Sequence, residues 1–366
     1  MDPIKLILKE DIGRLSKDIL NELCDTLEIP EDASPYDLAD IIYDEFLSSK
    51  EKMGIIYDSL HNVVYAGRRA ITWFSLPDEI ELINLPEAFE QRFGIKPYDS
   101  IIKRNPQSIG KSALVIGACS CGNKNRHLIR FLVGSGATRL PYGGSYNTHP
   151  ISTLVSTIID FDEKFIEIRS DPKYNARILR EYSILLGLND KKMIGPIKPI
   201  EPYGNRVEEL AKKLDGSVFK TDSRPDIILK QQLSEEQVAA TASILVAIDE
   251  YFEQQDINLL SERLTIGKNT LGSLADLPFS LALLSGLERV GISVNEVDDI
   301  KYQPLLVALK PYLESLGGFI RFPVNENGIE SYHTIRVGLT TKSVSFRTYA
   351  SEFAIDKVRK VILNQE

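Results

Sequence analysis

The chain has 366 residues, of which 43% are hydrophobic and 26% charged, and it carries a net charge of −9. This is a globular composition, and a chain of this length buries a substantial core without disulfides or metals. No apolar run approaches the roughly 20 residues that span a bilayer, and no secretion signal opens the sequence. With only three cysteines, we expect a cytoplasmic protein with no membrane partner.

Acidic and basic residues are unevenly distributed along the chain. Residues 1–100 contain 10 basic and 21 acidic residues, whereas residues 101–159 contain seven basic residues and no acidic one. A local reversal of charge says nothing about the fold, but it indicates what kind of partner a surface attracts.

The first part of the chain is predicted to be helical. Ser16 and Ser34 have the residue type and position of helix N-caps, and Pro35 fits the first turn of the second helix. Phe89 and Phe93 are four residues apart, which places them on one face of a later helix. We therefore expect an N-terminal helical module over residues 1–95 that is acidic outside and recruits a protein partner.

Strand signals begin after residue 95. Short apolar runs bounded by turn residues indicate buried strands, and a Gly-rich loop is expected at residues 134–144. The expected strands are Ser112–Ala118, His127–Val133, Thr153–Phe161 and Lys164–Arg169, the last two forming a hairpin, and a helix then runs to Gly187. Residues 96–190 are thus predicted to form an α/β domain that carries the basic segment.

A stretch rich in proline and glycine at residues 191–205 is predicted to be a linker. Residues 206–366 are predicted to form a C-terminal α/β domain, in which Ser234 opens a helix with a capping box and Pro304–Leu316 forms another helix. The fold class expected for the whole chain is α+β, a mixed α/β fold with a helical bundle at its start.

Two blocks of the chain resemble each other. Each consists of a strand, a tight turn with a lysine (Lys164 or Lys342), a second strand ending in an arginine (Arg169 or Arg347), and a helix. They predict two related ββα units that present paired basic side chains. Because short hairpin–helix units recur in unrelated proteins, we favour chance similarity over a true repeat.

Two short motifs suggest ligands but lack required parts. The sequence Gly110-Lys111-Ser112 lacks the first glycine of a phosphate-binding P-loop, and a strand rather than a helix is expected after it. Cys119 and Cys121 have no second cysteine pair to complete a zinc site. We therefore predict no cofactor and no metal site.

The basic segment is the main functional feature. Arginine offers a fork of donors that suits phosphate, lysine offers a point charge, and nearby glycines let a ligand approach the backbone. We predict a non-catalytic nucleic-acid-binding subunit or adaptor of a larger assembly, with DNA preferred over RNA. The predicted phosphate-binding residues are Lys103, Arg104, Lys111, Lys124, Arg126, His127, Arg130, Arg139, Arg169 and Arg347.

Three alternatives stay open. Asp160, Asp162 and Glu167 are close in sequence, so either these residues with a divalent metal or His127 suggest an enzyme that acts on nucleic acid or a nucleotide. A protein–protein scaffold would use the same charged surfaces without nucleic acid. Finally, the basic segment has the opposite charge to residues 1–100, so the two suit each other for docking within the chain. No catalytic residue is predicted.

Overall fold

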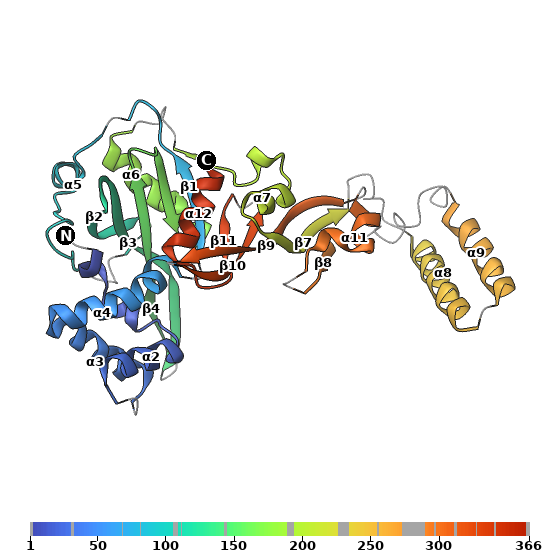
Figure 1. Ribbon diagram of the computed structural model, residues 1–366, viewed down its shortest axis with the longest axis horizontal. Coiled ribbons are helices and arrows are strands. Elements are labelled where there is room, and N and C mark those ends of the chain that lie inside the picture. Colours follow the sequence, from blue (N-terminus) through green and yellow to red (C-terminus); the bar gives the residue numbers. More distant parts are fainter. Residues whose placement is uncertain are drawn as a thin grey trace. The chain divides into compact units, whose positions relative to one another are not determined.

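The computed structural model describes residues 3–30, 33–67, 69–80, 82–104, 109–110, 112–142, 145–188, 194–225, 234–254, 256–272, 290–295, 298–310, 313–326, 328–339 and 342–363. The chain is of the α+β class and forms two compact units (Figure 1). Unit 1 comprises residues 1–204, 322–337 and 341–366, and unit 2 comprises residues 205–321 and 338–340. No described helix has the length and apolar character needed to cross a membrane.

Unit 1 is built on an antiparallel sheet in the order β2-β3-β4-β5-β1-β11-β10, followed by the end of β9. A short strand, β6 (Gly195–Pro196), also pairs with β1. The bounds of the strands are β1 Ala70–Ser75, β2 Ala113–Cys121, β3 Asn123–Tyr142, β4 Ser145–Asp160, β5 Phe165–Arg169, β9 Leu313–Glu326, β10 Ile329–Gly338 and β11 Val344–Phe346.

The expectation that the first hundred residues are helical is wrong at β1. This strand pairs with β5 on one side and β11 on the other, so it lies inside the sheet. Its residues 71–74 are all buried. A strand covered on both faces loses the alternation of polar and apolar residues, which is the pattern that distinguishes a half-buried strand in a sequence.

One face of this sheet, the core face, is apolar. It carries side chains such as Ile129, Phe131 and Ile166, which pack with residues of α5 (Leu85–Phe93) and α6 (Asn175–Leu186) in one hydrophobic cluster. The Tyr182 hydroxyl of α6 lies 2.6 Å from Thr157 Oγ1 on this face. Burial of these large apolar side chains supplies the main driving force for this part of the fold.

The other face, the charged face, carries Arg130, Glu167 and Arg169, because side chains alternate between the two faces of a strand. Helix α12 (Glu352–Ile362) and the N-terminal module (residues 3–66) cover it. The module consists of η1 Pro3–Leu6, α1 Lys9–Ile12, α2 Lys17–Leu27, α3 Pro35–Ser48, α4 Lys50–His61 and the π-helix η2 Asn62–Ala66, grouped together in Figure 1.

Local signals place the module's helices as expected. The Ser34 hydroxyl accepts a hydrogen bond from Asp37 N at 3.3 Å, and Pro35 follows in the first turn. Gly117 on β2 permits a close contact between the module and the sheet. A Cβ atom at this position would lie 2.5 Å from Leu6 Cδ2, so a larger residue would push η1 away.

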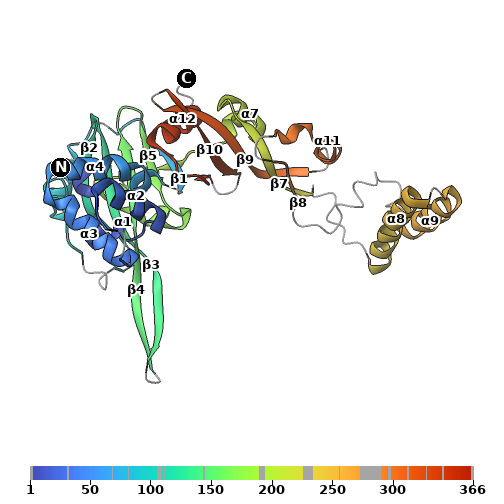
Figure 2. The ribbon, with the colours of Figure 1, turned by 60° about the horizontal axis from the view of Figure 1, so that its bottom comes forward.

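The expected hairpin of β4 and β5 is confirmed, but the expected Gly-rich loop is wrong. β3 continues through Gly134 and Gly136 to Tyr142 and pairs with β4 down to the Tyr142–Ser145 pair. Figure 2 shows this hairpin projecting well beyond the helices of unit 1. Glycines that suit a loop also suit a strand with an irregularity, and the register shifts between Gly134 and Gly136.

Both proposed ββα units exist in unit 1. β4, β5 and α6 form one, and β10, β11 and α12 form the other, with β5 and β11 on opposite sides of β1. The turn lysines share an unusual backbone conformation, with φ of 55° at Lys164 and 50° at Lys342. The similarity ends at the arginines, since Arg169 is fully buried and Arg347 is exposed.

Unit 2 combines a small sheet with a helical hairpin. The first part of β9 pairs with β7 (Ser217–Pro225), which also pairs with β8 (Val290–Ser293). The expected helix over Pro304–Leu316 is too long, because α11 ends at Leu309 and β9 begins at Leu313. The remaining helices are α7 Val207–Lys213, η8 Ile300–Tyr302, and the paired α8 Glu235–Gln254 and α9 Ile257–Leu271. In unit 1, η4 Pro172–Tyr174 precedes α6. The short helix η5 Glu201–Tyr203 lies just before residue 204, where the first segment of unit 1 ends.

Candidate anion-binding groove

Arg130 does not lie where a ligand phosphate would reach it. Only 1% of its surface is exposed, and its guanidinium donates two hydrogen bonds to Asp11, at 2.5 and 2.7 Å, and one to Leu6 O at 2.6 Å. The prediction that Arg130 contacts nucleic acid is therefore wrong. This residue joins the basic segment to the acidic N-terminal module, as the internal-docking alternative expected.

A groove of about 580 Å³ lies where the module meets the sheet. Residues 5–14 of the module and Tyr43 of α3 line one side, and residues 101–104 with side chains of β2, β3 and β4 line the other. Its apolar lining includes Leu8, Ile102 and Leu132. Such a groove offers an apolar floor with charged groups around it, which is a common form of binding site.

The charged groups of this groove are almost all basic. They are Lys5, Lys9, Arg14, Lys103 and Arg104, against a single acidic residue, Glu10. Among the described residues, no salt bridge joins Lys5 or Lys103 to a carboxylate. Lys9 has one such partner in Asp40, at 2.7 Å, and this hydrogen bond raises the pKa of Lys9. The groove therefore has an excess of positive charge, which suits an anion.

Backbone carbonyl groups hold two of the groove's guanidinium groups. Arg14 donates to Ser152 O at 3.0 Å and Arg104 donates to Val115 O at 3.3 Å. Arg69, next to β1, donates to Leu154 O at 3.3 Å in the same way. Because β5 ends at Arg169, opposite Ser156, Arg14 and Arg69 reach carbonyl groups of β4 beyond the part that β5 covers. Each guanidinium has five N–H donors, so others remain for a ligand.

A smaller cavity of about 200 Å³ adjoins the groove, since Arg14 lines both. Arg69 and Asp11 also line it. Burial lowers the pKa of Arg69 to about 10, and the charge of Arg130 acts in the same direction. The three guanidinium groups of Arg69, Arg130 and Arg14 outnumber the single carboxylate of Asp11 here, which extends the positive potential of the groove towards this cavity.

The residues near the turn between β2 and β3 form a separate group. Lys124 is exposed, and Arg126 Nε lies 3.9 Å from Asp160 Oδ2. His127 is 6% exposed and its Nδ1 lies 2.9 Å from Tyr98 Oη, so the prediction that it contacts phosphate is wrong. Burial also lowers the pKa of His127, which favours its neutral form.

Arg169 belongs to a buried ionic network and is also unavailable to a phosphate. It donates to Glu167 Oε1 at 2.6 Å and to Glu352 Oε2 at 2.8 Å. Arg359 of α12 donates to Glu167 Oε2 at 3.2 Å, and Trp73 Nε1 donates to the same oxygen at 2.7 Å. This network ties β1 and β5 to α12 and is structural.

The same contacts oppose a metal site at the three carboxylates of the enzyme alternative. Glu167 is fully buried between two arginines. Asp160 Oδ1 accepts hydrogen bonds from the backbone N–H groups of Asp162 and Glu163, and Asp162 accepts from Asn123 and Asn125. Within the described ranges, no group of three His, Cys, Asp or Glu side chains is placed to hold a metal ion.

The cysteines lie in two places. Cys24 is buried in α2 of the module, while Cys119 is buried and Cys121 half-buried on β2. Cys121 lines a cavity of about 290 Å³ together with His61 and Arg126. A hydrogen bond with Cys119 lowers the pKa of Cys121, and the charge of Arg126 contributes. Both cysteines on β2 are free thiols.

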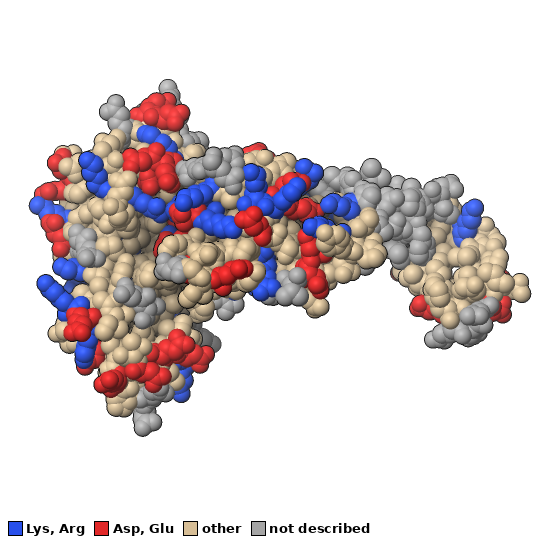
Figure 3. Space-filling model, viewed as in Figure 1, with Lys and Arg blue, Asp and Glu red and all other residues tan. Residues whose placement is uncertain are grey.

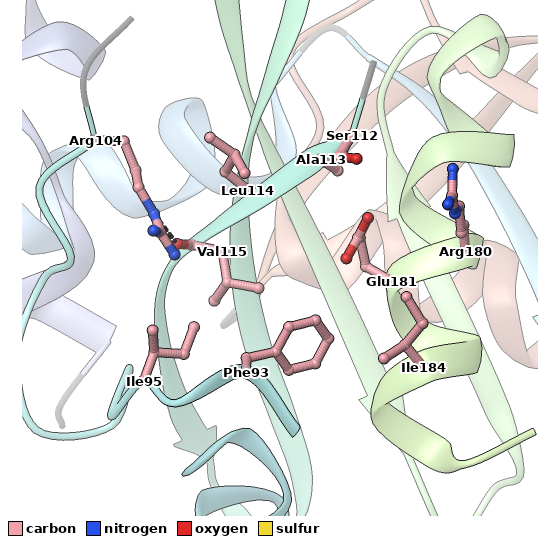
Figure 4. Close-up of a pocket in the computed structure, with 10 residues that line it drawn as sticks. All are labelled: Phe93, Ile95, Arg104, Ser112, Ala113, Leu114, Val115, Arg180, Glu181 and Ile184. Atoms are coloured by element: carbon pink, nitrogen blue, oxygen red, sulfur yellow. Dashed lines mark hydrogen bonds between the residues drawn. The ribbon is translucent and has the colours of Figure 1, made fainter. Parts of the chain in front are cut away.

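Another cavity, of about 270 Å³, lies between β2 and α6 and is drawn in Figure 4. Phe93, Ile95 and Ile184 give it apolar walls, and the Glu181 carboxylate points into it from α6. Burial raises the pKa of Glu181. Arg104 and Arg180 also line this cavity, so two basic residues face its single carboxylate, whereas the larger groove has five basic residues against one acidic residue.

Only part of the groove was predictable from the sequence. Lys103 and Arg104 belong to it, whereas Lys5, Lys9 and Arg14 were missed because they lie in the acidic first hundred residues. Arg347 is exposed just after β11, outside the groove. Lys111 and the side chain of Arg139 lie outside the described part of the structure.

Comparison of the chain with protein-family models, curated protein sequences and solved structures finds no match.

Proposed function

We propose that unit 1 binds the phosphate backbone of DNA in the basic groove, as a non-catalytic subunit or adaptor. The observation that supports this best is the convergence of five basic side chains from two distant parts of the chain around a single glutamate. Positive side chains that neutralise phosphates supply most of the sequence-independent affinity of proteins for nucleic acid. The apolar floor gives room for a sugar or base beside them.

The net charge of the chain fits a local site rather than a broad one. Figure 3 shows basic and acidic side chains next to one another over most of the face in view. The whole chain has a net charge of −9. Long-range attraction for DNA is therefore weak, and binding depends on the few cations that line the groove. Substitution of single basic residues in the groove should therefore change the affinity for DNA measurably.

The first test is the affinity of the full chain for a fluorescent 20-base-pair DNA, measured by anisotropy at constant low salt. We expect Lys5→Gln/Lys103→Gln to bind about tenfold more weakly, because two exposed charge contacts of somewhat under 1 kcal/mol each amount to about that factor. Both lysines are exposed, so the substitutions leave the fold intact.

The matched control is Lys17→Gln/Lys50→Gln. These two lysines are exposed on the same N-terminal module, at the first residues of α2 and α4, and neither lines the groove. The control removes the same net charge, so its affinity should stay within about twofold of wild type. Equal weakening by both double substitutions, or no DNA binding by the wild-type chain at low salt, would refute the groove as the DNA site.

A further inference from the structure

The end of the β3–β4 hairpin is a two-stranded ribbon without neighbouring strands. We define the ribbon as the backbone of Gly134–Tyr142 in β3 and Ser145–Ser152 in β4. Pairing of β2 with β3 stops at Val133, and pairing of β5 with β4 stops at Ser156. Eight or nine residues at about 3.3 Å each give a ribbon roughly 25–30 Å long. Figure 2 shows it extending away from the rest of unit 1.

The ribbon is continuous with the basic groove. Ser152 at the ribbon's base and Leu132 just before it both line the groove, and Arg14 of the groove donates to Ser152 O. The ribbon contains Arg139 and His149 and no acidic residue. A phosphate backbone held in the groove would therefore meet no negative charge along the ribbon, in contrast to the rest of this acidic chain.

An irregularity in β3 at the base of the ribbon changes the direction of the strand. The register shifts between Gly134 and Gly136, and Gly136 has φ of 149°, a conformation that favours glycine. A bulge of this kind bends a strand and increases its twist. Gly136, Ala137 and Thr138 on one strand, and Pro150 and Ile151 on the other, are exposed.

The ribbon is poorly suited to pairing with a strand of another protein. Pro141 and Pro150 lack the backbone N–H that a further strand would need, and they lie on opposite strands of the ribbon. Prolines in exposed strands are a common barrier to edge-to-edge association. The edges of this ribbon are therefore protected on both sides, and what it offers a partner is the width of its two-stranded backbone.

We infer that this ribbon enters the major groove of duplex DNA while the basic groove holds the adjacent phosphates. The inference rests on the proposed function and names duplex DNA as its ligand. The major groove of B-form DNA, about 12 Å wide, admits a two-stranded β-ribbon, whereas the deep major groove of A-form RNA does not admit side chains. Single strands offer no groove at all, so they should depend on the basic groove alone.

The test shortens the ribbon in the full chain. Residues 138–149 are replaced by Asn-Gly, which joins the Ala137–Pro150 pair by a two-residue turn of a kind that closes hairpins. Affinity is measured for a 20-base-pair duplex and for one of its strands. We expect the duplex to bind at least tenfold more weakly and the single strand to bind within about twofold of wild type. Arg139→Gln is the milder variant, with an expected loss of two- to fivefold for the duplex.

The outcomes separate the two proposals. Wild-type affinity of the shortened chain for the duplex, or equal loss for duplex and single strand, would overturn the ribbon inference and leave the basic groove untouched. Failure of the wild-type chain to bind either DNA would overturn the proposed function itself. Methylation of guanine N7, which lies in the major groove, should weaken the wild-type complex but not that of the shortened chain; equal weakening of both would also contradict the inference. Fluorescence of Trp73 checks that unit 1 is folded in each variant.

Discussion

At the scale of single residues, alternation along strands decides which arginines are available. Arg126, Arg130 and Leu132 are two or four residues apart on β3 and lie on the charged face. The N-terminal module covers the middle of that face, so Arg130 is buried in an ion pair while Leu132 lines the groove. The sequence shows the alternation, but it does not show which face a distant helical module covers.

The buried carboxylate of Glu167 gives a prediction of pH dependence. Burial raises its pKa, but the charges of Arg169 and Arg359 and two hydrogen bonds outweigh burial and hold it at about 2. An unfolded glutamate has a pKa of about 4.3. Because the pKa of Glu167 is lower in the folded state, ionised Glu167 stabilises unit 1 against unfolding by about 3 kcal/mol. This stabilisation is complete above about pH 4.5 and is lost as the pH falls towards 2.

The measurement is the free energy of unfolding between pH 7 and pH 2.5, followed through Trp73. This is the only tryptophan of the chain and it donates directly to Glu167. Glu167→Gln should destabilise unit 1 by about 3 kcal/mol at pH 7 and flatten the acid part of the curve. Glu201→Gln, which removes an exposed partner of Lys198, should change stability by under about 1 kcal/mol. An unchanged acid slope in Glu167→Gln would contradict the assignment.

At the scale of elements, local sequence signals predicted helix starts and a tight hairpin, which depend on interactions between residues close in sequence. The Ser34 cap is confirmed, and so is the capping box at Ser234, where Gln237 N donates to Ser234 Oγ and Ser234 N donates to the Gln237 side chain. The β4–β5 hairpin was also predicted. β1 and the long β3–β4 ribbon were not, because strands buried on both faces or made of small residues lack the usual alternation.

The left-handed backbone at the turn lysines of the two ββα units predicts how substitutions there change stability. Lysine in the left-handed conformation costs about 1 kcal/mol, so Lys342→Gly should leave stability unchanged or raise it by up to about 1 kcal/mol, after the entropy cost of glycine. Lys342→Val should lower it by about 1–2 kcal/mol, since a β-branched residue fits this conformation worst. Thermal unfolding of the two variants provides the comparison.

Lys164 serves as the matched position, because its backbone has the same conformation but its ammonium also donates to Ile80 O. Lys164→Gly loses this hydrogen bond and should therefore be less stable than Lys342→Gly. If valine is tolerated as well as glycine at position 342, the left-handed backbone conformation of this turn does not limit stability.

At the scale of the whole molecule, the charge reversal along the chain has two roles. Part of the acid-free segment docks on the acidic module, through Arg130 and Asp11, and part of it combines with basic residues of that same module to form the groove. The groove was only half predictable because Lys5, Lys9 and Arg14 lie more than 85 residues before Lys103 in the sequence. Net charge over a long segment conceals a few cations that the fold brings together.

The salt dependence of DNA binding reports how many phosphates the groove neutralises. Each phosphate neutralised on duplex DNA contributes about 0.9 to the slope of log Kd against log salt concentration, so the five basic residues of the groove predict a slope of about 4–5 for the wild-type chain. Lys5→Gln/Lys103→Gln should lower it by nearly 2, and Lys17→Gln/Lys50→Gln should leave it unchanged. A slope near zero for the wild-type chain, or the same slope for both double variants, would contradict the claim that this groove binds the DNA backbone.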